Sequence, residues 1–346
     1  MKLSASDLAI PTGSVVLVTG ASGFIATHIV DQLLLAGYRV RGTVRDEKKV
    51  AWTTELFTER HGAGKFSAVI VPEMSIEGAF DEAVKGVQGV VHSAAVMTFS
   101  PDPNEVIPES IAGATGILRS AAKESSVKSF VLTSSSMAAA GGVPGPNKHF
   151  SIDASTWNDG QIKEAWSVTS APFPPTHSSV VYGASKAEAE KAFWKFVEEE
   201  KPSFKVNTIL PDANMGGILS LQGSLSTGNW IRMFYNGAVD FVKGLPLQWY
   251  VNVDDTARIH VAALVSKSVQ NERIFAVAAP FNWGQIQAIF RKLRPSKSLP
   301  EVMLGAELSN MKVPNERGEQ LLKDVFGRPG WNILEETVAE NIKDLA

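Results

Sequence analysis

The sequence of 346 residues contains no cysteine. Disulfides, thiolate metal sites and cysteine nucleophiles are therefore excluded. An excess of charge of one sign is also lacking, because 33 Lys and Arg stand against 36 Asp and Glu and the formal net charge is −3. Without a field of one sign, neither nucleic acid nor a membrane surface is an expected partner.

Long apolar runs are missing as well. No stretch approaches the roughly 18 to 20 apolar residues that a membrane span needs, and the segment from Met1 to Gly13 has no apolar core of a secretion signal. The six histidines show no metal-ligand spacing. We therefore expect a cytoplasmic protein without a bound metal. Its oligomeric state, monomer or homodimer, stays open.

Short β-rich runs alternate with helical patterns through the first two thirds of the chain. The strand-like runs are residues 15–18, 39–44, 66–71, 89–92, 130–133 and 206–210. This alternation predicts an α/β fold with a Rossmann-type, doubly wound parallel sheet. From about residue 214 the alternation fails, apart from a strand-like return at residues 273–278. We predict a nucleotide-binding domain over residues 1–213, to which 251–278 returns, and a smaller, mostly C-terminal substrate lobe over 214–346.

A glycine-rich turn follows the first predicted strand and leads directly into a helical pattern. It reads Thr19-Gly20-Ala21-Ser22-Gly23-Phe24-Ile25-Ala26. Gly20 permits a sharp turn, and Gly23 lets backbone amides approach a pyrophosphate at the start of the helix. Such turns also occur for steric reasons alone. The strand-turn-helix setting favours dinucleotide binding, and the lack of a closing Gly-Lys-Ser/Thr excludes a mononucleotide P-loop.

The end of the second predicted strand indicates which dinucleotide is bound. An NAD enzyme places a carboxylate there for the ribose 2′-hydroxyl, whereas this chain has Arg45, followed by Lys48 and Lys49. These cations suit the 2′-phosphate of NADP. Two alternatives remain: an ordinary solvated loop, or Asp46 in the NAD role. NADP, as NADPH, is the favoured cofactor.

Tyr182 and Lys186 lie four residues apart in a long helical pattern that Tyr182 is expected to open, which places both on one helix face. A surface helical pair is the alternative. Three segments after predicted strands support a site: His92-Ser93-Ala94-Ala95, Thr133-Ser134-Ser135-Ser136 and Pro211-Asp212-Ala213-Asn214-Met215. Ligands of open α/β sheets bind at this carboxyl edge. The serine hydroxyls could equally satisfy only the strand ends.

Together with a late Tyr-Val-Asn-Val-Asp-Asp, these motifs resemble the extended short-chain dehydrogenase/reductases over essentially the whole chain. Within that family the sequence is most similar to fungal NADPH-dependent aldehyde and ketone reductases, relatives of dihydroflavonol reductases. The resemblance implies that Ser135 orients the carbonyl and Tyr182 donates the proton, with Ser134 and Ser136 as alternatives to Ser135. Lys186 would bind the nicotinamide ribose and lower the pKa of the Tyr182 phenol.

The remaining site residues are expected around this core. The cofactor-binding set is Gly20, Ser22, Gly23, Phe24, Ile25, Arg45, Lys49, Glu73, Met74, Ser93, Ala94, Ala95, Tyr182, Lys186, Pro211 and Met215. Glu73 stands where related enzymes place an aspartate near the adenine. By similarity, the substrate pocket is lined by Met97, Phe99, Trp230, Met233, Phe234, Leu245 and Gln248. These seven could instead be core residues. The Pro- and Gly-rich residues 141–176 are expected to fold over the site.

The sequence therefore predicts NADPH-dependent reduction of aldehydes and ketones, such as aryl ketones and keto esters. Two other functions remain open. A steroid dehydrogenase or nucleotide-sugar epimerase of the same fold would use the same Tyr-Lys pair. A non-catalytic dinucleotide sensor would bind the cofactor without needing a positioned acid.

Overall fold

The computed structural model describes residues 1–141, 150–299 and 307–346. Its main feature is a seven-stranded sheet in the order β10-β7-β5-β4-β1-β2-β3, in which every neighbouring pair is parallel. The strands are β1 (Val15–Thr19), β2 (Arg39–Val44), β3 (Phe66–Ile70), β4 (Gly89–His92), β5 (Ser129–Thr133), β7 (Lys205–Pro211) and β10 (Glu272–Ala276). The predicted Rossmann-type sheet is confirmed.

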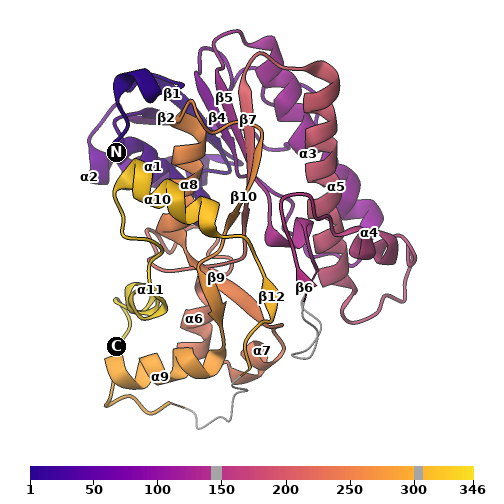
Figure 1. Cartoon of the computed structure of the whole chain (residues 1–346), viewed down its shortest axis with the longest axis vertical. Helices are drawn as coiled ribbons and strands as arrows, with labels where there is room; N and C mark the ends of the chain where they lie inside the picture. The colour runs from indigo at the N-terminus through magenta and orange to yellow at the C-terminus, as the bar shows by residue number, and fades with distance from the viewer. Residues whose placement is uncertain (142–149, 300–306) are drawn as a thin grey trace.

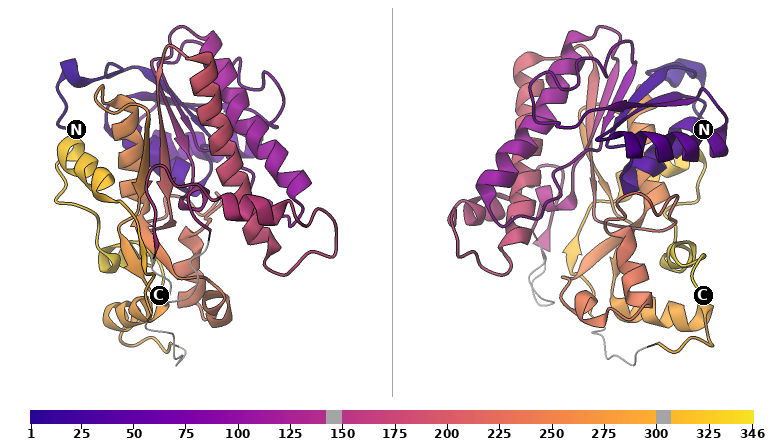
Figure 2. Two further views of the ribbon diagram at one scale, coloured as in Figure 1. Left: turned by 45° about the vertical axis from the view of Figure 1, so that its right-hand side comes forward. Right: turned by 180° about the vertical axis from the view of Figure 1, so that it is seen from behind.

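Helices cover both faces of this sheet (Figures 1 and 2). On one face lie α1 (Phe24–Leu35), α2 (Glu47–His61), α8 (Val253–Val265) and α10 (Glu316–Phe326), and on the other lie α3 (Pro103–Lys123), α4 (Asp159–Ala165) and α5 (His177–Glu200). The central strands are buried from both sides, so Val16, Leu17 and Val18 of β1 have no exposed surface. Strands buried on both faces are nearly continuous apolar runs, which explains why their sequences predict them well.

A smaller lobe follows β7 in the chain and lies at one end of the large sheet (Figure 1). Its sheet has the order β11-β9-β8, from β8 (Ala213–Met215), β9 (Gln248–Asn252) and β11 (Ala279–Phe281). Four helices, α6 (Gly228–Tyr235), α7 (Val239–Lys243), α9 (Trp283–Leu293) and α11 (Leu334–Asn341), accompany it. Aromatic rings fill its core, since Phe234, Tyr235, Phe281, Trp283 and Phe290 are all buried there.

Short elements complete the described chain. They are the 3-10 turns η1 (Ala5–Asp7) and η2 (Ser136–Ala138), and the parallel pair β6 (Phe150–Ser151) and β12 (Met311–Lys312). The pairing of β6 with β12 joins the segment before α4 to the C-terminal part of the chain.

The predicted division at residue 213 stays a prediction, but one helix beyond it packs away from the smaller lobe. Leu321, Leu322 and Val325 of α10 are buried in the same apolar cluster as α1 and α8. Together with α8 and β10, α10 therefore builds the large layered unit, although sequence analysis assigns it to the substrate lobe. Within the described ranges, no helix is both long and apolar enough to cross a membrane.

Candidate active site

The glycine-rich turn connects β1 to α1 in a conformation that requires glycine. Gly20 has a φ of 65°, and a Cβ atom at this position would lie 3.0 Å from the Cα of Ala94. Gly23 is the N-cap of α1 and supplies no side chain to accept from the amides of the first turn. The start of α1 therefore offers unpaired N–H groups and the positive end of a helix dipole, which suits a pyrophosphate.

A buried hydrogen-bond cluster joins this turn to the end of β4. The Thr19 hydroxyl accepts from the backbone N–H groups of Ser93 and Ala94, both at 3.1 Å, and lies 2.8 Å from Nδ1 of His92. Because its oxygen already accepts two hydrogen bonds, the hydroxyl donates to His92. Burial lowers the pKa of His92 to about 3, with a smaller contribution from Lys186, so the ring is neutral. The glycine-rich turn and the segment that follows β4, both predicted to bind the cofactor, are thus held side by side.

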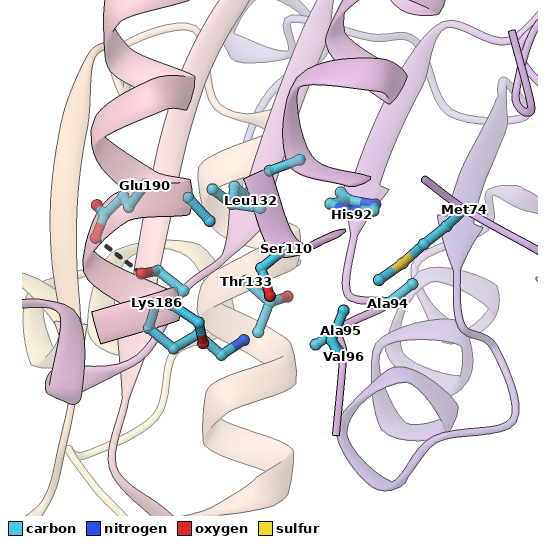
Figure 3. Close-up of a pocket in the computed structure, with 14 residues that line it drawn as sticks. Met74, His92, Ala94, Ala95, Val96, Ser110, Leu132, Thr133, Lys186 and Glu190 are labelled. Atoms are coloured by element: carbon cyan, nitrogen blue, oxygen red, sulfur yellow. Dashed lines mark hydrogen bonds between the residues drawn. The ribbon is translucent and has the colours of Figure 1, made fainter. Parts of the chain in front are cut away.

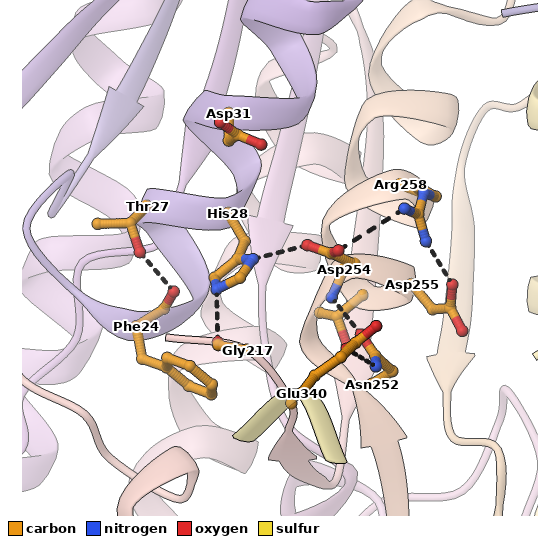
Figure 4. Close-up of polar contacts among 12 residues, drawn as sticks. Phe24, Thr27, His28, Asp31, Gly217, Asn252, Asp254, Asp255, Arg258 and Glu340 are labelled. Atoms are coloured by element: carbon orange, nitrogen blue, oxygen red, sulfur yellow. Dashed lines mark hydrogen bonds and ion pairs between the residues drawn. The ribbon is translucent and has the colours of Figure 1, made fainter. Parts of the chain in front are cut away.

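His28 of α1 is tied both to α8 and to the segment that follows β8 (Figure 4). Nδ1 of His28 lies 2.7 Å from Oδ1 of Asp254 in α8, and Nε2 lies 3.0 Å from the carbonyl oxygen of Gly217. Ser224 also forms a β-bridge with Gly23. This segment after β8 therefore lies against the glycine-rich turn, a contact that the sequence did not predict.

The cations after β2 have distinct surroundings. Asp46 is the N-cap of α2, where its carboxylate accepts from the Lys49 backbone N–H at 2.9 Å and pairs with Lys49 Nζ at 3.1 Å. These hydrogen bonds from Lys49 hold the pKa of Asp46 below its usual value. Helix capping therefore occupies Asp46, the residue that could have served NAD. Arg45 is exposed at the strand end and lies outside this pair.

Two carboxylates share the surroundings of Arg45. Glu73 accepts hydrogen bonds from the backbone and side chain of Ser75, and these, with the charge of Arg45, lower its pKa. Glu109 of α3, which sequence analysis did not single out, has its pKa raised by burial and by Glu73.

Tyr182 and Lys186 lie on one face of α5, whose first residue is His177 rather than Tyr182 as the sequence suggested. Lys186 Nζ is 5.8 Å from the centroid of the Tyr182 ring. The Ser135 hydroxyl accepts from the Met137 backbone N–H at 3.2 Å, and it lies close enough to the Tyr182 phenol to influence the pKa of that phenol. Residues from β5 and α5 thus meet at the carboxyl edge of the sheet.

The electrostatics of this group differ from the expectation. Burial raises the pKa of Tyr182, a hydrogen bond from Ser135 opposes the rise, and the charge of Asp212 adds to it. The pKa of Tyr182 is therefore raised overall, and because Lys186 is not among the causes of the shift, its predicted lowering of this pKa stays a prediction. Burial also lowers the pKa of Lys186 to about 8, against the opposing effect of Glu190.

The four hydroxyl side chains from Thr133, the last residue of β5, to Ser136 have different partners. Thr133 lies 2.9 Å from Nε2 of His260, and Ser134 donates to Glu190 at 2.8 Å. The Ser136 side chain acts on Asp212, where it lowers the pKa of the carboxyl against the larger effect of burial. Ser135 is the member that reaches Tyr182, whereas the sequence left Ser134 and Ser136 as alternatives.

A small cavity lies beside Lys186, between α3, α5 and the ends of β4 and β5 (Figure 3). Its lining includes Met74, Ala94, Ala95 and Lys186 of the predicted cofactor set, together with His92 and Glu190. Met215 and Pro211, by contrast, are buried, and Met215 belongs to the core of the smaller lobe. Their side chains have almost no surface left for a ligand.

The predicted pocket residues are not all brought together. The Phe99 ring centroid is 5.6 Å from that of Tyr182, and the side chains of Phe99 and Met97 are 54% and 43% exposed. Phe234 is instead a core residue, packed on Trp283 and Phe290 at 5.5 Å each. Trp230, Met233, Leu245 and Gln248 are partly buried in the smaller lobe. The structure thus places Phe99 beside Tyr182, leaves Met97 exposed and makes Phe234 a core residue rather than a lining residue.

Part of the segment 141–176 reaches the site, although its residues 142–149 lie outside the described ranges. Asn158 donates from Nδ2 to the Met137 carbonyl at 2.8 Å, and its backbone N–H donates to the Ala138 carbonyl at 3.0 Å. Helix α4, which follows, packs on α5. This segment therefore contacts the residues directly after Ser135.

A parallel sheet with a glycine-rich turn, and a Ser-Tyr-Lys group at its carboxyl edge, define a dinucleotide-binding enzyme of the short-chain dehydrogenase/reductase type. The chain belongs to the NAD dependent epimerase/dehydratase family, whose sequence model matches residues 16–278. The predicted membership in the extended branch of these enzymes is confirmed.

Its relatives include named reductases. Aldehyde reductase 2 of Sporidiobolus salmonicolor is 40% identical, over 97% of this chain and 96% of its own. Ketoreductase adrE of Penicillium rubens is 39% identical, over 94% and 95%. The crystal structure of yeast methylglyoxal/isovaleraldehyde reductase Gre2 with NADPH has a TM-score of 0.80 and 25% identity, covering 96% of this chain and 98% of that one. These relatives support an oxidoreductase that acts on carbonyl or alcohol groups.

Proposed function

We propose that this chain reduces aldehydes and ketones to alcohols with NADPH. The observation that carries the proposal is the grouping of Tyr182, Lys186 one helical turn away and the Ser135 side chain near the phenol, at the edge of the sheet where the glycine-rich turn also lies. Bound NADPH would supply the hydride. The glycine at position 20 and the uncapped start of α1 fit its pyrophosphate.

The side chains would divide the remaining work. As the carbonyl carbon gains its new C–H bond, negative charge develops on the oxygen, and Ser135 donates a hydrogen bond to it. Tyr182 transfers its phenolic proton to that oxygen, so C=O becomes CH–OH. Because burial raises the pKa of Tyr182, the phenol keeps its proton at neutral pH and is ready to donate it. Lys186 would hold the nicotinamide ribose.

Arg45 supports NADPH over NADH. The side chain is exposed at the end of β2, and the neighbouring carboxylate of Asp46 is engaged in capping α2. A guanidinium can form two charge-assisted hydrogen bonds to a 2′-phosphate. Lys49 would add charge from the first turn of the helix, and Glu73 would face the adenine end.

The exposed side chains of Met97 and Phe99 support an apolar substrate. Since the Phe99 ring lies beside Tyr182, a carbonyl next to an aromatic or bulky apolar group would contact the ring while its oxygen reached the phenol. Aryl ketones and keto esters fit this description.

A panel of aryl ketones, β-keto esters and aldehydes, each with NADPH and with NADH, tests the proposal through loss of the reduced cofactor's absorbance. Carbonyl-dependent oxidation with NADPH preferred is the expected result. No oxidation with any member of the panel would contradict it.

The family description favours a second candidate, an epimerase or dehydratase of the same fold. Such an enzyme would retain NAD through purification and show no net oxidation of cofactor. A reductase would exchange NADPH freely, so analysis of the nucleotide that copurifies with the protein separates the two. The placement of Ser135 and Lys186 around Tyr182 argues against a sensor that needs no acid.

A further inference from the structure

Glu190 is a buried carboxylate one helical turn beyond Lys186 on α5. Its side chain has no exposed surface, and its oxygens accept from the hydroxyls of Ser134 at 2.8 Å and Thr208 at 2.7 Å. Nε of Arg273, from β10, donates to it at 2.9 Å. A buried ion pair yields little net stability because desolvation offsets the attraction. Stability alone therefore does not account for this pair.

Arg273 extends the contact to the segment before α4. Its guanidinium lies 3.8 Å from the centroid of the Trp157 ring, and Nη1 donates to the carbonyls of Ala154 and Thr156, both at 2.8 Å. Asn158, which follows Trp157, donates hydrogen bonds to the backbone carbonyls of residues 137 and 138. The ion pair of Glu190 and Arg273 is therefore linked, through residues 154–158, to the chain that follows Ser135.

Ser135 is thus held from both directions. The residue before it, Ser134, is bound to Glu190, and the residues after it are bound to the segment that Arg273 anchors. We propose that Glu190, paired with Arg273, is a positioning residue: it fixes Ser135 beside Tyr182 and keeps Lys186 in its ammonium form. The inference deepens the proposed function and rests on it for the roles of Ser135 and Lys186.

The charges around Lys186 agree with this role. Burial lowers the pKa of Lys186 to about 8, and Glu190 raises it. The other titratable or charged groups around the pair are His92 of β4, Tyr182 of α5, Asp212 after β7 and Arg273 of β10. His92 is neutral, and Asp212 acts on Tyr182. Helix α3 contributes only Ser110 and Ala114 to the cavity lining. Lys186 and Glu190 line the same cavity, one helical turn apart on α5.

Glu190→Gln tests the proposal in two ways. Competitive acylation with acetic anhydride, followed by peptide mass spectrometry, reports the neutral fraction of Lys186 without any turnover. Near pH 6.5 we expect Lys186 to react about 3- to 10-fold faster in the variant, since its neutral fraction grows by about tenfold for each unit of lowered pKa. In carbonyl reduction, we expect kcat to fall by about tenfold or more, whereas the KM for the carbonyl changes much less.

Glu188→Gln is the matched control. Glu188 lies on the same helix and loses the same charge, but it accepts from Nε1 of the exposed Trp166 at 3.0 Å. Lys186 should react in this variant as in the unmodified protein.

Glu190→Gln leaves Arg273 buried without its partner, which destabilises the fold. A second variant is therefore used in case the single variant does not fold. Glu190→Gln combined with Arg273→Gln removes both charges, so it should fold and still show the faster acylation of Lys186. Unchanged acylation of Lys186 in a folded Glu190 variant would overturn the inference. If the unmodified protein reduced no carbonyl, the proposed function would fail, while the acylation comparison would still decide whether Glu190 sets the charge of Lys186.

Discussion

The ammonium of Lys186 lies 5.8 Å from the centroid of the Tyr182 ring, one turn further along α5. On the strand side, the Ser135 hydroxyl opposes the rise that burial causes in the pKa of the same phenol. The phenol therefore has a hydroxyl from the segment after β5 and a cation from its own helix nearby, while burial keeps its pKa high. This arrangement suits a group that gives up a proton only when charge develops next to it.

Tyr182→Phe removes the proposed proton donor and little else. We expect kcat for carbonyl reduction to fall by about 10²- to 10⁴-fold, whereas the Kd for NADPH changes by less than about twofold because the ring remains. Steady-state kinetics and fluorescence titration measure the two quantities. Tyr38→Phe is the control, because that hydroxyl donates to the Ile10 carbonyl away from the site. Normal turnover by Tyr182→Phe would remove Tyr182 from the mechanism.

Arg45→Ala tests cofactor choice. Loss of a charge-assisted, two-pronged contact should shift the ratio of kcat/KM for NADPH to that for NADH by roughly one to two orders of magnitude towards NADH. Arg39→Ala removes an exposed arginine from the opposite end of the same strand and should leave the ratio unchanged. An unaltered ratio in Arg45→Ala would show that Arg45 does not contact the 2′-phosphate.

Asp212→Asn tests the carboxyl that acts on Tyr182. Burial raises the pKa of Asp212 to about 7, and above that pH its negative charge raises the pKa of Tyr182. Without the charge, the phenol loses its proton at lower pH, so the alkaline limb of the kcat profile should move down by up to about one pH unit. Asp240→Asn, at a fully exposed position, is the control. An alkaline limb that stays in place would separate Asp212 from the titration of Tyr182.

Asp254→Asn tests the link between α1 and α8. Burial opposes ionisation of Asp254, but His28, Arg258 and Arg60 together hold its pKa below the usual value. A lowered pKa in the folded state means that the carboxylate adds stability above about pH 4 and that this contribution is lost as the pH falls through the folded pKa. We expect the free energy of unfolding to drop by about 1–3 kcal/mol at pH 7. The difference should shrink in urea titrations near pH 3, and a constant difference would contradict the electrostatic explanation.

The strands of the large sheet could be predicted closely because each one is a short apolar run that is visible in the local sequence. Buried parallel strands appear as apolar runs such as Val16–Leu17–Val18. The predicted bounds match those observed or differ by one residue, except at the end of β10, where they differ by two. The start of α5 was less clear, since Thr176 forms no side-chain cap before His177. A helix that begins without a capping side chain has a weak sequence signal.

The site was predictable only in part, because contacts with distant parts of the chain decide which partner each neighbouring side chain faces. Nothing in the local sequence says that Ser134 faces Glu190 while Ser135 faces Tyr182. The four-residue step from Lys186 to Glu190 was the available signal for Glu190, but its partner Arg273 comes from a strand more than eighty positions away. Phe234 shows the opposite case, since packing on Phe290 and Trp283 decides that it is a core residue.

The most direct test of the proposed function is to follow the transferred hydride. The unmodified protein would be incubated with an aryl ketone and with NADPH that carries deuterium at the transferable position of the nicotinamide. Mass spectrometry and NMR of the product should then show one deuterium on the carbinol carbon for each NADPH oxidised. A product alcohol without deuterium, or cofactor that is not consumed while substrate is converted, would contradict carbonyl reduction by direct hydride transfer at this site.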